Sequence, residues 1–250
     1  MNLFRTPAIF SEYPHLVAAE STRHGGVSPA PWHSLNLGKN TADAAENTAE
    51  NRRRFCAALG FSPEQLAWSK QVHGAEVLVA TAPGGAEGFD ALATQTPGVF
   101  LSVSVADCTP VLVFDPVHRA VAAIHAGWRG AAAGIVGKTL HTMAEAFGTR
   151  GADCMAYVGT CIDECSFEVG AEVAAEFDPV FKRYDPERNR FFVDLKKACT
   201  AQLLAAGLAA ERIEVSPFST VLHGEDYFSH RKSGGVTGRM LAVIGLREGI

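Results

Sequence analysis

The stretch VFLSVSVADCTPVLVFDPVHRAVAAIHAGWRG, residues 99–130, decides the fold of this chain. Apolar and β-branched residues fill the runs 99–105, 111–114 and 120–124, and the last two runs are separated by turn residues at 115–119. Short apolar runs bounded by turn signals are typical of buried strands, and a run that returns after a tight turn is typical of a hairpin. The stretch therefore predicts three buried strands that lie close together in one core.

The remainder of the chain alternates short strands with helical segments. Strands are predicted at 16–20, 66–72, 77–80, 155–158, 191–193, 213–215 and 240–246, and helices at 43–59, 131–147, 168–177 and 194–206. Gly60 is a favoured residue just past a helix end, and Asp194 is the expected N-cap of the last helix. We expect an α/β (α+β) layered sandwich with a mixed β-sheet core flanked by helices. Because no linker or repeat divides the sequence, residues 1–250 are expected to form a single domain.

The bulk composition excludes several classes of protein. The 250 residues are 47% hydrophobic and 20% charged, with a formal net charge of −5. This negative balance argues against nucleic acids and anionic membranes as partners, because both are bound by basic patches. The first ten residues lack the apolar segment of a signal peptide, and no apolar run approaches the ~20 residues of a membrane span. The six cysteines have no CxxC or disulfide-framework spacing, so we expect a cytoplasmic protein with reduced thiols.

Three residues at predicted strand ends carry the candidate chemistry: His73, Cys108 and His125. Zinc accepts imidazole and thiolate together, and three protein ligands beside an open position are typical of a catalytic zinc site. The spacing leaves other interpretations open, because a cysteine at a strand end is commonly a small buried hydrophobe and a histidine beside glycine is commonly a loop residue. A metal-free alternative uses Cys108 as the nucleophile and His125 as the base of a cysteine hydrolase.

Arginines in glycine-containing segments are the candidates for binding an anion. Arg129 lies in the GWRG segment before the helix predicted at 131–147, where free backbone N–H groups favour a phosphate. Arg23 lies in the loop 21–38, and loops of that length are commonly functional. Arg231 is a third candidate. For Arg129 an ordinary tight turn is the alternative, and Arg23 and Arg231 can equally be surface arginines.

At these residues the chain resembles the YfiH-like family of laccase-domain proteins, also called polyphenol oxidoreductases. The motifs that carry the resemblance run almost end to end: TRHGGVS at 22–28, LNLG at 35–38, QVHG at 71–74, DAL at 90–92, ADC at 106–108, HAGWRG at 125–130 and TGRM at 237–240. The chain departs from the family pattern at Thr160, where proline is usual, at Ser219, where cysteine is common, and at Lys232, where a second arginine is frequent. These departures lie outside the candidate zinc ligands.

The resemblance implies a zinc enzyme whose small-molecule partners are purine nucleosides and phosphate. The implied reactions are phosphorolysis of adenosine, inosine and methylthioadenosine to the base and (methylthio)ribose 1-phosphate, together with adenosine deamination. The implied ligands of one catalytic zinc ion are His73, Cys108 and His125, and the implied fold is related to that of CNF-like deamidating toxins. Relatives are also implicated in editing peptidoglycan precursors, which a cysteine-type amidase would perform.

The resemblance leaves the metal and the proton carrier to be assigned. Copper is chemically possible at a His2Cys site but less favoured, and a chain of nine histidines without a His-x-His pair does not supply a multicopper oxidase cluster. Polyphenol oxidation therefore stays an alternative to the nucleoside reaction. Asp107 is the nearest candidate for the general acid or base, and Arg129, Arg23 or Arg231 would position phosphate during catalysis. The sequence does not predict the oligomeric state.

Overall fold

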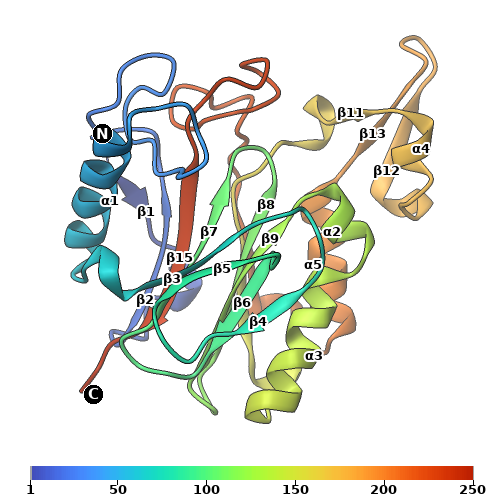
Figure 1. Cartoon of the computed structure of the whole chain (residues 1–250). Coiled ribbons are helices and arrows are strands. Elements are labelled where there is room, and N and C mark those ends of the chain that lie inside the picture. The colour runs from blue at the N-terminus through green and yellow to red at the C-terminus, as the bar shows by residue number, and fades with distance from the viewer. Residues whose placement is uncertain (1, 250) are drawn as a thin grey trace.

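Two six-stranded β-sheets form the centre of the molecule (Figure 1). The computed structural model describes residues 2–249. The first sheet has the order β1 (Phe4–Arg5), β2 (Leu16–Ser21), β15 (Met240–Leu246), β7 (Phe100–Val105), β3 (Leu66–Lys70) and β5 (Gly84–Glu87). The second has the order β14 (Ile213–Val215), β10 (Met155–Val158), β8 (Thr109–Asp115), β9 (Ala120–Ala126), β6 (Ala91–Thr94) and β4 (Val77–Val79). Both sheets mix parallel and antiparallel pairs, as the sequence predicted.

Helices and a small third sheet surround the two large sheets. The helices are α1 (Ala45–Leu59), α2 (Trp128–Ala132), α3 (Ile135–Phe147), α4 (Ala171–Ala174) and α5 (Leu195–Ala205), and the third sheet has the order β11 (Glu168–Val169), β13 (Arg190–Val193) and β12 (Lys182–Asp185). Helix α1 lies on one side of the paired sheets, and α3 and α5 lie on the other (Figure 1). No helix among residues 2–249 is long and apolar enough to cross a membrane.

Alternate residues of the central strands enter different cores. Leu112 of β8 packs between the two sheets, whereas its neighbours Val111 and Val113 pack against α3 and α5. In β2, Ala18 faces the second sheet and Val17 faces α1. Successive side chains of a strand point to opposite faces, so strands covered on both sides must be apolar throughout. This explains the continuous apolar runs and confirms a layered sandwich, although two stacked sheets form its centre.

Two of the predicted helices are wrong in part. The helix predicted at 131–147 is split into α2 and α3, because Gly134 adopts a left-handed backbone with φ of 77°. The helix predicted at 168–177 begins instead with strand β11, which pairs with β13, and continues only as the short α4. Gly170 separates the two with an extended backbone, so strand pairing overrides the local helical pattern.

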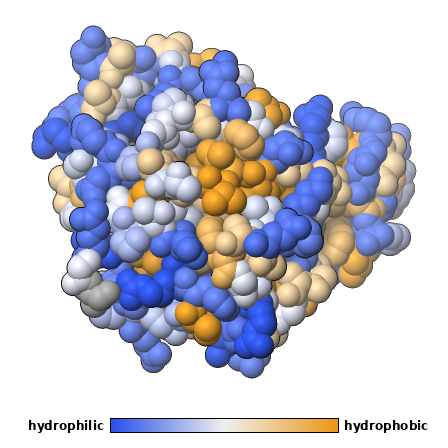
Figure 2. All heavy atoms as spheres, turned by 60° about the horizontal axis from the view of Figure 1, so that its bottom comes forward, coloured by the Kyte–Doolittle hydropathy of each residue, from blue (hydrophilic) through white to orange (hydrophobic). Residues whose placement is uncertain are grey.

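The surface of the lower face of the molecule is uneven in polarity. Hydrophobic residues gather there in a central patch with hydrophilic residues around it (Figure 2). Some apolar surface is ordinary in folded proteins, because polar atoms are too few to cover the whole surface.

Candidate metal centre

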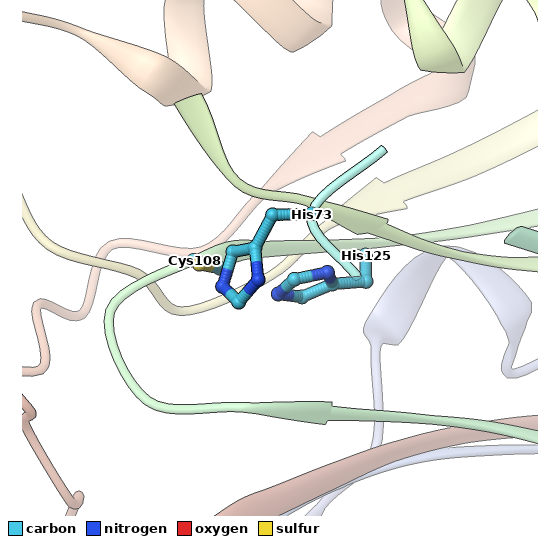
Figure 3. Close-up of side chains that lie close together, drawn as sticks. All are labelled: His73, Cys108 and His125. Carbon is cyan, nitrogen blue, oxygen red and sulfur yellow. The ribbon is translucent and has the colours of Figure 1, made fainter. Parts of the chain in front are cut away.

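The three candidate ligands come from three different strand ends. Strands β3 and β7 are parallel neighbours, so their carboxyl ends reach the same edge of the first sheet. His73 follows β3, and Cys108 lies in the turn that carries the chain from β7 to β8 of the second sheet. There β8 pairs with β9, where Pro110 lies opposite His125. The three side chains consequently meet between the sheets (Figure 3), and their ligand atoms all lie within 4.8 Å of one another.

Asp90 fixes the geometry of two of the three ligands. Its Oδ1 atom lies 2.7 Å from Nδ1 of His125, which leaves Nε2 of that ring free to meet a metal. The same carboxylate accepts backbone hydrogen bonds from His73 at 2.9 Å and from Gly74 at 2.8 Å. Burial raises the pKa of the Asp90 carboxyl, but the hydrogen bonds from His125 and Gly74 outweigh burial and hold the pKa below its ordinary value. A carboxylate behind a ligating histidine is typical of metal sites.

The environment of Cys108 favours the thiolate. Burial raises the pKa of this thiol, but the charges and hydrogen bonds of His125 and His73 outweigh burial and lower the pKa to about 6. In the same way, burial lowers the pKa of His125, but Cys108 and Asp90 outweigh it and raise the pKa to about 9. A thiolate is the form that either binds zinc or acts as a nucleophile, so these electrostatics suit both chemistries.

Gly127 leaves the space in which the three ligands meet. A Cβ atom at this position would lie 3.0 Å from Cδ2 of His73, 3.3 Å from Sγ of Cys108 and 3.7 Å from Cε1 of His125. The residues around the centre therefore fit a small ion, since a glycine keeps the cradle open and the donor set is one that zinc accepts.

The candidate metal centre opens into a cavity of about 470 Å³. Apolar side chains of Trp128, Ile162 and Phe167 line part of it, and polar side chains line the remainder. Pockets of this size, with apolar walls and a few converging polar groups, are typical of small-molecule sites.

Asp107 and two of the predicted arginines line this cavity. Oδ1 of Asp107 accepts a hydrogen bond from the Thr220 hydroxyl and Oδ2 accepts one from the backbone N–H of Arg231, both at 2.6 Å. The guanidinium of Arg231 donates to the backbone carbonyl of Glu168 at 3.0 Å. The exposed Arg129 stacks its guanidinium 4.2 Å from the centre of the Trp128 ring.

Arg23 is not brought to the cavity. Its Nε donates to the carbonyl of His33 at 3.0 Å, its Nη1 donates to the carbonyl of Gly224 at 2.7 Å, and its guanidinium lies over the Phe228 ring. Arg23 thus ties two loops together. Conversely, four residues of the site were not predicted from the sequence: Asp90, Lys39, Arg52 and Arg239. The available signal was the DAL motif, which contains Asp90, and the TGRM motif, which contains Arg239.

Comparison with known proteins places the chain in a family. The family described as multi-copper polyphenol oxidoreductase laccase matches residues 17–247. A protein of Deinococcus radiodurans named purine nucleoside phosphorylase is 41% identical, and the match covers 99% of this chain and 94% of that relative. A protein of Bacteroides thetaiotaomicron with the same name is 37% identical, with 94% of this chain and 93% of the relative covered. The chain therefore belongs to the laccase-domain polyphenol oxidoreductase family, whose YfiH-like members it was expected to join.

Two further relatives agree with this assignment. The Escherichia coli protein named purine nucleoside phosphorylase YfiH is 36% identical, covering 92% of this chain and 94% of the relative. The crystal structure of YlmD from Geobacillus stearothermophilus has a TM-score of 0.91 to this structure at 33% identity, and the match covers 99% of this chain and all of that one. The layered fold is thus shared over the whole length.

Proposed function

We propose that this chain is a zinc-dependent purine nucleoside phosphorylase that cleaves adenosine, inosine and methylthioadenosine and also deaminates adenosine. The observation that carries the proposal is the convergence of His73, Cys108 and His125 on the wall of a cavity, in a chain whose relatives are named purine nucleoside phosphorylases. Two imidazoles and one thiolate, with room for a further ligand, are a donor set that suits catalytic zinc better than a multicopper centre. When bound, zinc supplies a Lewis acid at this position.

The other residues of the cavity have roles in binding and proton transfer. Trp128, Ile162 and Phe167 offer apolar surface against which a purine ring can pack. In phosphorolysis the bond from the base to ribose C1′ breaks, a phosphate oxygen bonds to C1′, and the departing base takes up a proton. Asp107, held by Thr220 and Arg231, carries that proton, and Arg129 adds positive charge to the cavity that receives the anionic substrate.

The deciding experiment incubates the zinc-loaded protein with adenosine, with and without phosphate, and separates the products by chromatography. We expect adenine only in the tube with phosphate, and inosine in either tube from deamination. The Cys108→Ala variant should bind less zinc and lose both activities. If adenosine returns unchanged from both tubes, or if a metal-free Cys108→Ala protein retains wild-type rates, the proposal is wrong.

One observation favours a second candidate function, a cysteine-type amidase. Cys108, His125 and Asp90 are arranged as a nucleophile, a base and an orienting carboxylate would be. An amidase predicts that the metal-free protein hydrolyses acyl-amino-acid precursors and that iodoacetamide abolishes this activity. The zinc enzyme predicts the reverse: zinc protects Cys108 from alkylation, and removal of zinc abolishes turnover.

A further inference from the structure

The charge of the cavity is strongly unbalanced. The cationic side chains that line it are Lys39, Arg52, Arg129, Arg231 and Arg239, and the carboxylate among the lining residues is Asp107. Within residues 2–249, none of these five cations forms a salt bridge with a carboxylate. Since the chain as a whole carries a net charge of −5, this concentration of positive charge is a local feature. Such a lining attracts an anionic ligand.

Three of the cations, Lys39, Arg52 and Arg239, lie together at the segment 37–39, next to the first sheet. Nε of Arg52 donates to the carbonyl of Leu37 at 2.9 Å, and the backbone N–H of Leu37 donates to the carbonyl of Arg239 at 3.0 Å. Gly38 lies so close to the Arg239 side chain that a Cβ atom would come within 2.7 Å of its Cγ. Lys39 follows directly, with Nζ 3.7 Å from the centre of the Trp68 ring. The loop that carries Lys39, the helix that carries Arg52 and the segment just before β15 that carries Arg239 thus place three cations beside one another.

Arg52 is the most informative member of this group. It projects from α1 and is only 8% exposed, yet within residues 2–249 its two terminal nitrogens have no hydrogen-bond acceptor. Burial lowers the pKa of Arg52 to about 10, and burial together with the charge of Arg52 lowers the pKa of Lys39. The side chain is largely buried but its terminal nitrogens still reach the cavity, so a ligand there that supplies hydrogen-bond acceptors is favoured.

Arg231 and Arg239 each donate from Nη1 to two backbone carbonyls. Arg239 differs in its contacts with Leu37 and Gly38, which place it beside Arg52 and Lys39. The guanidinium of Arg129 lies exposed over Trp128. Because Nε of Arg52 donates to Leu37, the Nη1–Nη2 edge of its guanidinium is the free one. Such an edge matches a tetrahedral oxyanion, because its parallel N–H groups bind two oxygens at once. We propose that Lys39, Arg52 and Arg239 form an oxyanion subsite that binds a phosphate group. The subsite rests on the proposed function only for the source of that phosphate.

Two sources of phosphate share this chemistry. Inorganic phosphate would be the co-substrate of phosphorolysis, whereas a 5′-phosphate would belong to a nucleotide substrate. Calorimetric titration of the zinc-loaded protein with inorganic phosphate, and separately with adenosine 5′-monophosphate, distinguishes them. If inorganic phosphate is the source, it should bind in the absence of any nucleoside. If a nucleotide is the source, adenosine 5′-monophosphate should bind tightly, and inorganic phosphate should displace it only weakly.

The test compares Lys39→Gln and Arg52→Lys with Arg53→Gln. Arg53 is a matched control, because it lies on the same helix but pairs with Glu50 in solvent. We expect Lys39→Gln and Arg52→Lys each to weaken phosphate-group binding by about tenfold or more, since a charge-assisted hydrogen bond is lost in each. In turnover, the KM for phosphate should rise while the KM for adenosine stays unchanged. The control should bind and react as the wild type does.

The calorimetry needs no turnover, so it separates failure of the subsite from failure of the proposed function. Suppose that no nucleoside is cleaved, but that the wild type binds the phosphate group and Lys39→Gln does not. The subsite is then supported and the phosphorylase proposal is wrong. If wild type binds neither inorganic phosphate nor the monophosphate, the subsite is wrong. It is equally wrong if Lys39→Gln and Arg52→Lys bind as wild type does while Arg129→Gln loses binding. Because Lys39 is exposed, its variant tests the proposal even if a change at Arg52 impairs folding.

Discussion

Nδ1 of His125 lies 2.7 Å from Oδ1 of Asp90, and both side chains are almost completely inaccessible to solvent. The same carboxylate accepts the backbone N–H groups of Val72, His73 and Gly74, so it holds the turn that presents the second histidine. His73 has a left-handed backbone with φ of 59°, a conformation that needs such support. One buried carboxylate therefore positions two candidate ligands that come from different sheets.

Replacement of Asp90 by Asn should weaken metal binding. Loss of the charge behind His125 makes that imidazole a poorer ligand, and changes of this kind lower metal affinity by roughly 10–100-fold. Competition with a zinc chelator measures the effect. Asp115→Asn is the matched control, because Asp115 is also buried and holds Nδ1 of His118 at 2.8 Å. Equal zinc affinity for both variants would contradict the role assigned to Asp90.

Replacement of Gly127 by Ala should disturb the metal centre without unfolding the protein. The backbone of Gly127 has φ of −69° and ψ of 166°, which alanine adopts freely. The added Cβ would press on His73 at 3.0 Å and on Cys108 at 3.3 Å, so we expect lower zinc occupancy and lower activity at a similar melting temperature. Metal analysis and thermal unfolding test this.

Gly137→Ala is the control for that variant. A Cβ at Gly137 meets nothing within 4 Å, and the residue lies inside α3, where alanine is favoured over glycine by about 0.5–1 kcal/mol. It should therefore raise stability and leave zinc occupancy unchanged. Full zinc occupancy and activity in Gly127→Ala would show that the close approach of Gly127 to the ligands is unimportant.

The buried carboxyl of Glu20 should make stability depend on pH. Burial raises its pKa from 4.5 to about 7, despite the hydrogen bonds from Tyr157 and Thr160. The folded state therefore holds this proton more tightly than the unfolded state. The stabilisation is complete below the unfolded pKa and is lost as pH rises through about 7. The loss amounts to about 3 kcal/mol as an order of magnitude.

Glu20→Gln should flatten this part of the stability curve. Glutamine resembles the neutral acid in shape, so the variant should be more stable than the wild type above pH 7 and show a smaller slope between about pH 5 and about pH 8. Urea unfolding at several pH values provides the measurement. The exposed Glu145→Gln, whose residue lies on the surface of α3, should leave the slope unaltered. If the stability of Glu20→Gln has the same slope against pH as that of the wild type, Glu20 is not the source of the pH dependence.

Arg23→Gln should affect stability and leave phosphate binding unchanged. The guanidinium donates to the carbonyls of His33 and Gly224, and hydrogen bonds from a charged group contribute about 1.5–3 kcal/mol each. We therefore expect a lower melting temperature with an unaltered KM for phosphate. A selective rise in that KM would return Arg23 to the substrate-binding residues.

Much of the secondary structure could be predicted because it depends on local pattern. The α5 helix begins after Asp194, whose side chain accepts the backbone N–H of Lys197 at 2.9 Å, and α1 ends at Gly60 in the left-handed conformation. A capping residue and the backbone groups that it contacts are separated by only a few positions, so caps can be predicted from the sequence. The segment 168–177 could not be predicted in this way, because its pairing with β13 is a contact between distant residues.

The sequence by itself determined the apolar strands and placed His73, Cys108 and His125, the residues of the candidate metal centre, at three strand ends. It did so because burial requires a particular periodicity, which is a property of local sequence. Only the tertiary structure decided that Asp90 hydrogen-bonds Nδ1 of His125 and that Arg23 joins two loops away from the cavity. It also decided that Arg52 and Arg239 lie beside Lys39. These relationships join residues far apart in the chain, and the packing of two sheets and a helix brings them together.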